Sequence, residues 1–347
     1  MKTCCTVFLL AVLVGSLASL HAEEAKPVIT LMTHDSFAVT EGLLRAFEKK
    51  NKTELKILKS GDAGAALTQA ILSRSNPLAD VFFGVDNTFM SRALAADIFE
   101  PYASPMLRGI PGPLKLDPKN RLLPVDFGDV CVNYDTRWFA EKGLSPPDAL
   151  EDLVQPQYKG LMVVQNPATS SPGLAFLLAT IGRFGEAAYL DFWRKLRAND
   201  VYVTAGWSEA YYGQFSRARG GTRPIVVSYA SSPSAEVYYS EKKPANAPTA
   251  AVVSPGSAFR QIEFVGVLKG TRQRHLAQRL IDFILGPEFQ KDIPLHMWVF
   301  PANSQTPLPE IFHKFSRQAS KPVALSPQAI EAGREKWVEA WTEVVLR

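Results

Sequence analysis

Cysteine is scarce in this chain of 347 residues, which contains only Cys4, Cys5 and Cys131. The first two lie in an amino-terminal segment that we expect to be removed, which leaves Cys131 without a partner for an internal disulfide. A protein of this length buries enough apolar surface to fold without covalent cross-links. A small disulfide-stabilised scaffold is therefore excluded.

An excess of charge of one sign is also lacking, because 38 Lys and Arg residues are balanced by 34 Asp and Glu residues, for a formal net charge of +4. There is no long basic block, so we expect no nucleic-acid partner. None of the five histidines has the spacing of a zinc site. Nucleophile-elbow, Walker and dinucleotide-binding motifs are missing from strand–turn–helix contexts, so we expect no metal and no cofactor.

Long apolar runs are missing except at the amino terminus. Residues 1–22 combine Lys2, an apolar stretch from Val7 to Val14 and small residues up to Ala22, the layout of a secretory signal peptide cleaved near Ala22. The stretch is shorter than the roughly 20 residues that span a membrane. Loss of Lys2 changes the net charge from +4 to about +3. We therefore expect a soluble protein exported to the periplasm.

Predicted strands and helices alternate in the first third of the chain. They are a strand over Val28–Thr33, a helix near 40–50, a strand over Leu55–Leu58, a helix up to Ser73, a strand over Asp80–Phe83 and a helix over Thr88–Ala96. Short helices between strands predict parallel α/β units. Ligands of such sheets bind beyond the carboxyl ends of the strands.

A second α/β region follows the proline-rich stretch from Pro101 to Pro118 and begins with a predicted crossover strand, Val130–Asn133. Its other predicted elements are strands over Leu161–Val164, Val201–Val203 and Ile225–Ser228 and helices beginning near Pro172 and over Leu190–Arg197. After this region we predict a strand over Ile262–Leu268 that returns to the first region, and helices over 272–293 and from Ser326. The prediction is two lobes, 27–125 with 256–347 and 126–255, with chain crossovers and a ligand cleft between them.

Polar residues follow three predicted strands of the first lobe. They are His34 and Ser36, Asp62, and Asp86. The two aspartates could accept hydrogen bonds from a ligand amine or balance a positive charge. Equally, they could be ordinary turn residues, since Asp favours such positions. We treat all four as candidate ligand-binding residues.

Ser170 and Ser171 precede Pro172 at the start of an apolar helix. A serine can cap that helix, and Pro172 suits its first turn. The free N–H groups and the helix dipole attract an anion such as phosphate. The alternative is a helix cap with no ligand.

Trp207, Tyr229 and Trp298 lie at or near junctions between strands and loops. Such rings can stack on a flat ligand ring, and a cationic ring gains about 0.5–2 kcal/mol from each well-placed face. Each aromatic residue taken singly could instead belong to the core. Their shared placement favours a binding cleft.

Covalent catalysis has little support. Cys131 lies within an apolar run, which favours inert burial over a nucleophile. The pairs Tyr211-Tyr212 and Tyr238-Tyr239 could suggest a ferric site, but no further acidic or histidine ligand is evident. We predict a binding protein and not an enzyme.

Several segments in this order resemble the periplasmic thiamine-binding proteins of bacterial ABC importers. The two most specific are Thr-Ser-Ser-Pro-Gly at 169–173 and Gly-Trp-Ser-Glu-Ala-Tyr at 206–211; the others are Thr-His-Asp-Ser-Phe at 33–37, Gly-Val-Asp-Asn at 84–87, Ser-Tyr at 228–229, and Ile-Pro at 293–294 with Trp298 and Pro301. The resemblance covers nearly all of the chain after the signal segment.

The resemblance implies a two-lobed, type II periplasmic binding fold that delivers thiamine, thiamine monophosphate or thiamine diphosphate to a permease in the inner membrane. By position, Asp62 corresponds to the residue that binds the aminopyrimidine. The rings of the ligand would contact Trp207, Tyr229 and Trp298, and the phosphate end would lie near Ser170 and Ser171.

Three positions depart from the family pattern: His34 replaces a tyrosine, the Thr40-Glu41 region replaces a tryptophan, and Ala235 replaces a tyrosine whose space Tyr238 or Tyr239 could fill.

Two alternative functions follow from the shared architecture. One is a binder of ferric ion or a polyamine, and the other is a thiamine-cleaving enzyme that uses Cys131.

Overall fold

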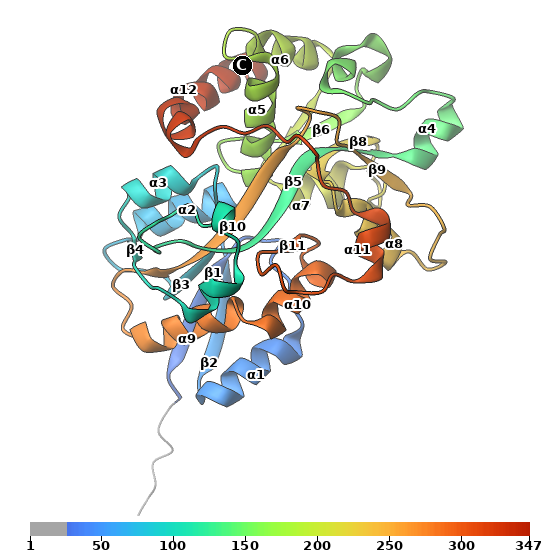
Figure 1. Ribbon diagram of the computed structural model, residues 1–347. Coiled ribbons are helices and arrows are strands. Elements are labelled where there is room, and N and C mark those ends of the chain that lie inside the picture. The colour runs from blue at the N-terminus through green and yellow to red at the C-terminus, as the bar shows by residue number, and fades with distance from the viewer. Residues whose placement is uncertain (1–25) are drawn as a thin grey trace, which may run out of the picture.

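Two long antiparallel strands connect the two lobes of the molecule. They are β5 (Leu123–Asp135) and β10 (Phe259–Leu268), which cross the centre of the view in Figure 1. The computed structural model describes residues 26–347, so the predicted signal peptide lies outside the described residues. Around β5 and β10 one continuous sheet has the strand order β2-β1-β3-β10-β5-β8-β6-β7.

The first lobe contains the parallel strands and the helices of the chain's beginning, together with elements that return after β10. Its strands are β1 (Val28–Thr33), β2 (Glu54–Lys59), β3 (Val81–Asp86) and β4 (Phe99–Glu100), and its helices are α1 (Glu41–Asn51), α2 (Ala63–Leu72), α3 (Met90–Ala95), α9 (Arg274–Ile284) and α10 (Pro287–His296). β1 pairs in parallel with β2 and β3, and β10 runs antiparallel to β3.

The second lobe extends the sheet beyond β5. Its strands are β6 (Met162–Gln165), β7 (Tyr202–Thr204), β8 (Ile225–Tyr229) and β9 (Thr249–Val252), and its helices are α4 (Thr136–Lys142), α5 (Ser171–Phe184), α6 (Tyr189–Ala198), α7 (Trp207–Glu209) and α8 (Ser232–Tyr239). β8 and β9 pair antiparallel with β5, whereas β6 pairs in parallel with β8 and β7.

Short or late elements complete the chain. They are the 3-10 helices η1 (Pro105–Gly109), η2 (Gly112–Leu114), η3 (Leu150–Val154) and η4 (Pro156–Tyr158), the π-helical turn η5 (Ala210–Gln214), strand β11 (Phe300–Pro301) and helices α11 (Glu310–Phe315) and α12 (Pro327–Val345). Among residues 26–347, none of the helices combines the length and the apolar character that crossing a membrane requires.

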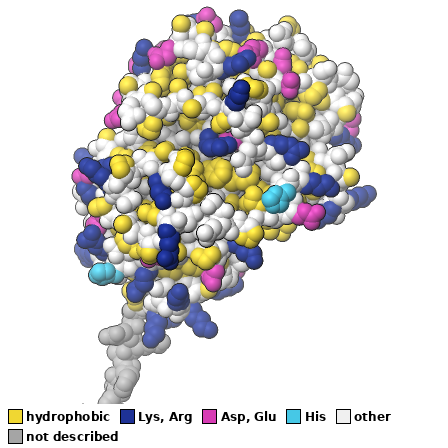
Figure 2. Space-filling model, in the orientation of Figure 1, with side chains coloured by type: hydrophobic (Ala, Val, Ile, Leu, Met, Phe, Trp, Pro, Cys, Tyr) yellow, Lys and Arg dark blue, Asp and Glu magenta, His cyan; other side chains and the backbone are white. Residues whose placement is uncertain are grey.

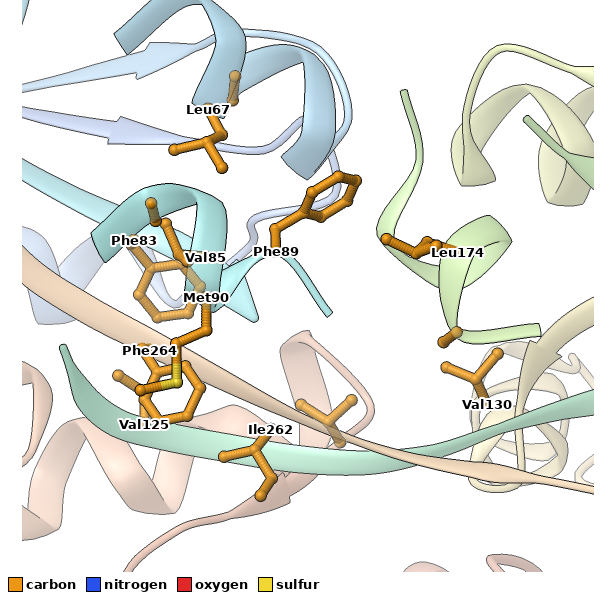
Figure 3. Packing of buried hydrophobic residues seen from close by; sticks show 14 of the residues in the cluster. Leu67, Phe83, Val85, Phe89, Met90, Val125, Val130, Leu174, Ile262 and Phe264 are labelled. Carbon is orange, nitrogen blue, oxygen red and sulfur yellow. The ribbon is translucent and has the colours of Figure 1, made fainter. Parts of the chain in front are cut away.

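The core continues from one lobe into the other along β5 and β10. Figure 3 shows Val125 of β5, Phe264 of β10 and Phe83 of β3 packed together, with Leu174 of α5 facing Val130 further along β5. All residues of β3 are buried, as expected for a parallel strand covered on both faces. This packing fixes the strand ends from which the candidate site is built.

The carboxyl-terminal helix α12 belongs to the segment 256–347, which we predict to be part of the first lobe, and it contacts elements of both lobes. It packs on α6 of the second lobe and also contacts α3. The rings of Trp193 and Trp341 meet edge to face with centroids 5.5 Å apart, and Arg197 Nη1 donates to the carbonyl oxygen of Val344 at 2.9 Å. Helix α12 therefore packs against both lobes.

Two predicted elements have different bounds in the structure. The segment 272–293 forms two helices, because the chain breaks at Gly286 and restarts with Pro287 in the first turn of α10. Strand β3 runs to Asp86, where the sequence pattern predicted a loop after Phe83. The second difference changes the environment of a candidate ligand-binding residue.

Candidate functional site

A cavity of about 600 Å³ lies between the lobes. Its walls come from the loop after β1, the ends of β2 and β8, the starts of α2 and α5, the segments α7–η5 and α8, one residue of β10, and the turn between α10 and β11. Cavities of this size hold small organic ligands. On the face shown in Figure 2, Lys and Arg side chains are spread among acidic and uncharged ones. The local groups of the cavity therefore decide which ligand it accepts.

The structure brings seven of the nine candidate residues to this cavity. They are His34, Ser36, Asp62, Ser171, Trp207, Tyr229 and Trp298. The remaining two, Ser170 and Asp86, lie behind its wall, where both are fully buried.

Asp62 bridges the two lobes. Its Oδ1 accepts hydrogen bonds from the backbone N–H groups of Ala63, at 2.7 Å, and Ser171, at 3.2 Å. Its Oδ2 accepts from the Ser170 hydroxyl and from the Trp207 N–H, both at 2.9 Å. A carboxylate has about four acceptor positions, so the protein itself satisfies this one. In this conformation Asp62 has no acceptor position left for a ligand amine.

The start of α5 therefore already holds an anion. Ser170 caps the helix by accepting from the N–H of Gly173, and the Asp62 carboxylate bonds to the first turn from the opposite lobe. The interaction that the sequence predicted for a phosphate is made here by a side chain. The physical reason is the same, because free N–H groups and the helix dipole favour negative charge.

Asp86 ends β3 and does not reach the cavity. Its carboxylate accepts from the N–H and hydroxyl of Thr88, from the N–H of Phe89, and from the hydroxyl of Ser171 at 2.5 Å. Gln261 also donates to it. Burial raises the pKa of Asp86 to about 6, although these hydrogen bonds oppose the rise. Asp86 thus supports the wall, because β3 continues where a loop was predicted.

Two groups of aromatic rings border the cavity. In the first, Trp207 stacks on Tyr211 with centroids 4.8 Å apart and meets the edge of Tyr212 at 5.3 Å. In the second, Trp298 lies 5.2 Å from Tyr238 and 5.6 Å from Tyr239. The tyrosine pairs considered for a ferric site thus contribute rings beside the two predicted tryptophans, and Tyr212 and Tyr239 line the cavity. Tyr239 and Ala235 both face it from α8, so a ring stands near the position where the family tyrosine is missing.

Glycines allow two of the candidate side chains their positions. A Cβ on Gly84, whose φ is +110°, would lie 2.6 Å from the ring of His34, and one on Gly128 would lie 2.8 Å from the ring of Tyr229. The Tyr229 hydroxyl donates to Gln261 Oε1 at 2.8 Å. Both rings therefore pack directly against strands of the sheet, which a larger residue would prevent.

Sequence reasoning did not select six acidic or basic residues that line the cavity: Asp35, Lys59, Arg217, Glu236, Glu263 and His296. Glu236 accepts from the Tyr211 hydroxyl at 2.8 Å and pairs with Arg217 at 3.5 Å. The signal for Glu263 was present, since it is the one carboxylate of the predicted strand Ile262–Leu268, whose other residues are apolar or glycine. The signals for the others were weak, because surface charges are common.

His34 Nε2 lies 3.3 Å from the carboxylate of Glu263. Burial by itself lowers the pKa of His34, but the negative charges of Glu263 and Asp62 outweigh it, so the pKa is raised above 6.5. His34 therefore carries positive charge over more of the neutral range than a free histidine does.

Cys131 is fully buried in β5 and is not part of the cavity wall. Burial raises the pKa of its thiol, so the reactive thiolate is disfavoured. In residues 26–347, no group of three or more His, Cys, Asp or Glu side chains is arranged to hold a metal ion. Cys131 is therefore not placed to attack a ligand in this cavity.

Comparison with known proteins agrees with the two-lobed fold. Residues 76–316 match the family of bacterial extracellular solute-binding proteins, and the chain belongs to this family. Its fold is that of the type II periplasmic binding proteins, as predicted. It superposes with a TM-score of 0.82 on a structure described as a periplasmic thiamin binding protein, at 29% identity over 93% of this chain and 97% of the other.

Several proteins similar to this chain are described as thiamine-binding periplasmic proteins. Those of Salmonella typhimurium and Escherichia coli are each 33% identical to this chain, over 93% of it and 95% of the relative. The one from Brucella suis is 31% identical over 94% of both chains. An iron-bound protein, HitA from Pseudomonas aeruginosa, shares the fold with a TM-score of 0.72 at 19% identity.

Proposed function

We propose that this chain is the solute-binding component of an ABC importer, located in the periplasm, and that its ligand is thiamine. The observation that carries this proposal is the cavity bordered by aromatic rings from two separate segments, with carboxylates at its floor. Relatives that cover nearly the whole chain have the same named ligand. A flat, cationic vitamin suits stacked rings and negative local charge.

Capture requires no covalent step. The ligand enters between the lobes, stacks near Trp207 and Trp298, and the lobes close around it. A ligand favours the closed state only by the difference in its affinity for the two states, so groups from both lobes must contact it. Nanomolar affinity corresponds to a binding free energy of about −12 kcal/mol. Several ring contacts and charge-assisted hydrogen bonds supply it.

The proposal extends to thiamine monophosphate and thiamine diphosphate. Asp62 occupies the start of α5, so a phosphate in this conformation would meet the cavity cations Lys59 and Arg217. Delivery then requires docking of the closed protein on an inner-membrane permease.

Titration calorimetry with thiamine, its two phosphates, spermidine and Fe(III) tests the ligand. We expect saturable binding of thiamine at one site and no comparable heat from spermidine or Fe(III). Binding of Fe(III) or spermidine without thiamine would overturn the proposal.

Mass spectrometry of thiamine incubated with the protein tests the absence of catalysis. We expect the vitamin to be recovered intact at stoichiometric binding. Recovery of cleaved pyrimidine and thiazole products would show an enzyme.

A further inference from the structure

Three carboxyl groups form a row across the sheet beneath the cavity. Glu263 of β10 pairs directly with Asp86 of β3 on one side and with Asp126 of β5 on the other. Directly opposed residues of antiparallel strands point to the same face, with Cβ atoms about 5 Å apart. The three side chains therefore lie side by side, and Glu263 is the central one.

The two outer members of the row are buried. Asp86 is held by its hydrogen bonds to Thr88, Phe89 and Ser171. Asp126 is 1% exposed, and its Oδ2 has no hydrogen-bond partner among the described residues. Burial and the adjacent Glu263 carboxylate raise the pKa of Asp126 well above 3.8, so a proton on Asp126 is favoured over its loss beside Glu263.

Glu263 is the member that faces the cavity. It is part of the cavity wall, and 13% of its side chain is exposed. His34, with Nε2 at 3.3 Å, and Asp126 are its neighbours, and within residues 26–347 neither they nor any other side chain forms a well-aligned hydrogen bond to it. Among the other cavity carboxylates, Asp62 accepts four hydrogen bonds, Glu236 is bound by Tyr211 and Arg217, and the exposed Asp35 accepts from the N–H of Gly61 at 3.0 Å. Glu263 thus has acceptor positions free for a ligand.

We propose that Glu263 binds an N–H donor nitrogen of the ligand, and that His34 and Asp126 couple this binding to the release of protons. The inference rests on the proposed function, under which the donor is the amino group of the thiamine aminopyrimidine. It assigns that contact to Glu263 instead of Asp62, whose oxygens hold the lobes together.

The direction of the coupling follows from charge. In the free protein, the negative charge of Glu263 favours protonation of His34 and Asp126. An N–H donor or a cationic ligand bound at Glu263 offsets part of that negative charge. Both groups then lose protons more readily in the complex than in the free protein, so binding releases protons and affinity rises with pH. The other charged or titratable groups facing this cluster are Asp86, Asp62, Lys59 and Tyr229. Asp86 and Asp62 are held by protein donors, and Lys59 donates to the backbone oxygen of Asp35.

Calorimetry of thiamine binding at pH 6, 7 and 8, in two buffers with different ionisation enthalpies, measures the released protons directly. Release of about half a proton per ligand would make binding about tenfold tighter at pH 8 than at pH 6.

In Glu263→Gln we expect affinity at pH 8 to fall about tenfold or more, because a hydrogen bond to a charged group is lost. Proton release should fall towards zero. The matched control Glu288→Gln, an exposed carboxylate in α10, should retain both properties.

Oxythiamine, in which an oxo group replaces the amino group, tests the contact itself. Wild-type protein should prefer thiamine, and Glu263→Gln should lose most of that preference. Asp126→Asn, buried behind Glu263, should reduce proton release, and thermal melts of each variant establish that it is folded.

Equal affinity, selectivity and proton release in Glu263→Gln and wild type would overturn the inference while leaving thiamine binding intact. Failure of wild-type protein to bind thiamine would instead overturn the proposed function.

Discussion

Single residues at this site have consequences that depend on the partners the fold supplies. Asp62 and Glu263 are both carboxylates of the cavity wall, yet one is saturated by protein donors and the other is not. An acceptor whose positions are all filled by protein donors stabilises the cavity wall, whereas an acceptor with free positions can accept a hydrogen bond from a ligand. The same functional group, a carboxylate, therefore holds the lobes together at Asp62 and is available to a ligand at Glu263.

Asp86 should make stability depend on pH. Burial raises its pKa from the ordinary 3.8 to about 6 in the folded protein, so the folded state binds the proton more tightly than the unfolded chain does. The stabilisation is complete below about pH 4 and is lost as pH rises through about 6. We expect Asp86→Asn to flatten the dependence of the free energy of unfolding between pH 4 and 6, measured by denaturant titration. A slope equal to that of wild type would contradict the buried, protonatable state of Asp86.

At the scale of elements, α12 shows how a helix near the end of the chain joins the two lobes. Its buried residues include Trp337 and Trp341, and it contacts both α6 and α3. The apolar stripe was visible in the sequence, but its packing partner was not. The reason is that periodicity identifies the buried face of a helix and says nothing about what covers it.

Trp341→Ala should destabilise the protein by about 3–5 kcal/mol, because it leaves a cavity against Trp193. Chemical denaturation measures the change, and Glu339→Ala on the exposed face of α12 provides the control. Equal stability of Trp341→Ala and wild type would show that α12 does not pack on α6 in solution.

At the scale of the whole molecule, the lobes are joined by β5 and β10 and by hydrogen bonds across the cavity. The bridge at Asp62 joins the start of α2 to the starts of α5 and α7. These bonds exist only when the lobes are close together. They therefore contribute to the equilibrium between open and closed forms, which a ligand then shifts.

Asp62→Asn should favour the open form and weaken thiamine binding by about tenfold or more, because charge-assisted bonds between the lobes are lost. Small-angle scattering of the ligand-free variant should report a larger radius of gyration, and calorimetry the lower affinity. Asp148→Asn, an exposed change in the second lobe, is the control. A variant with wild-type scattering and affinity would exclude the bridging role.

Much of the architecture was predictable because it depends on local patterns. Alternating strands and helices indicated parallel α/β units, and the predicted return of Ile262–Leu268 to the first lobe is confirmed by its pairing with β3. The residues at strand ends, such as His34 and Asp62, were found by the rule that sites form beyond the carboxyl ends of strands.

The sequence by itself determined the two-lobed class, the family resemblance and seven residues of the cavity wall, because each of these follows from periodicity or short motifs. Only the tertiary structure decided which residues meet one another. Glu263 joins His34 and Asp126 from segments far apart in the chain, and Asp62 meets the α5 start from the opposite lobe. Hydrogen-bond saturation and pKa depend on such distant neighbours and on burial, which a linear pattern does not contain.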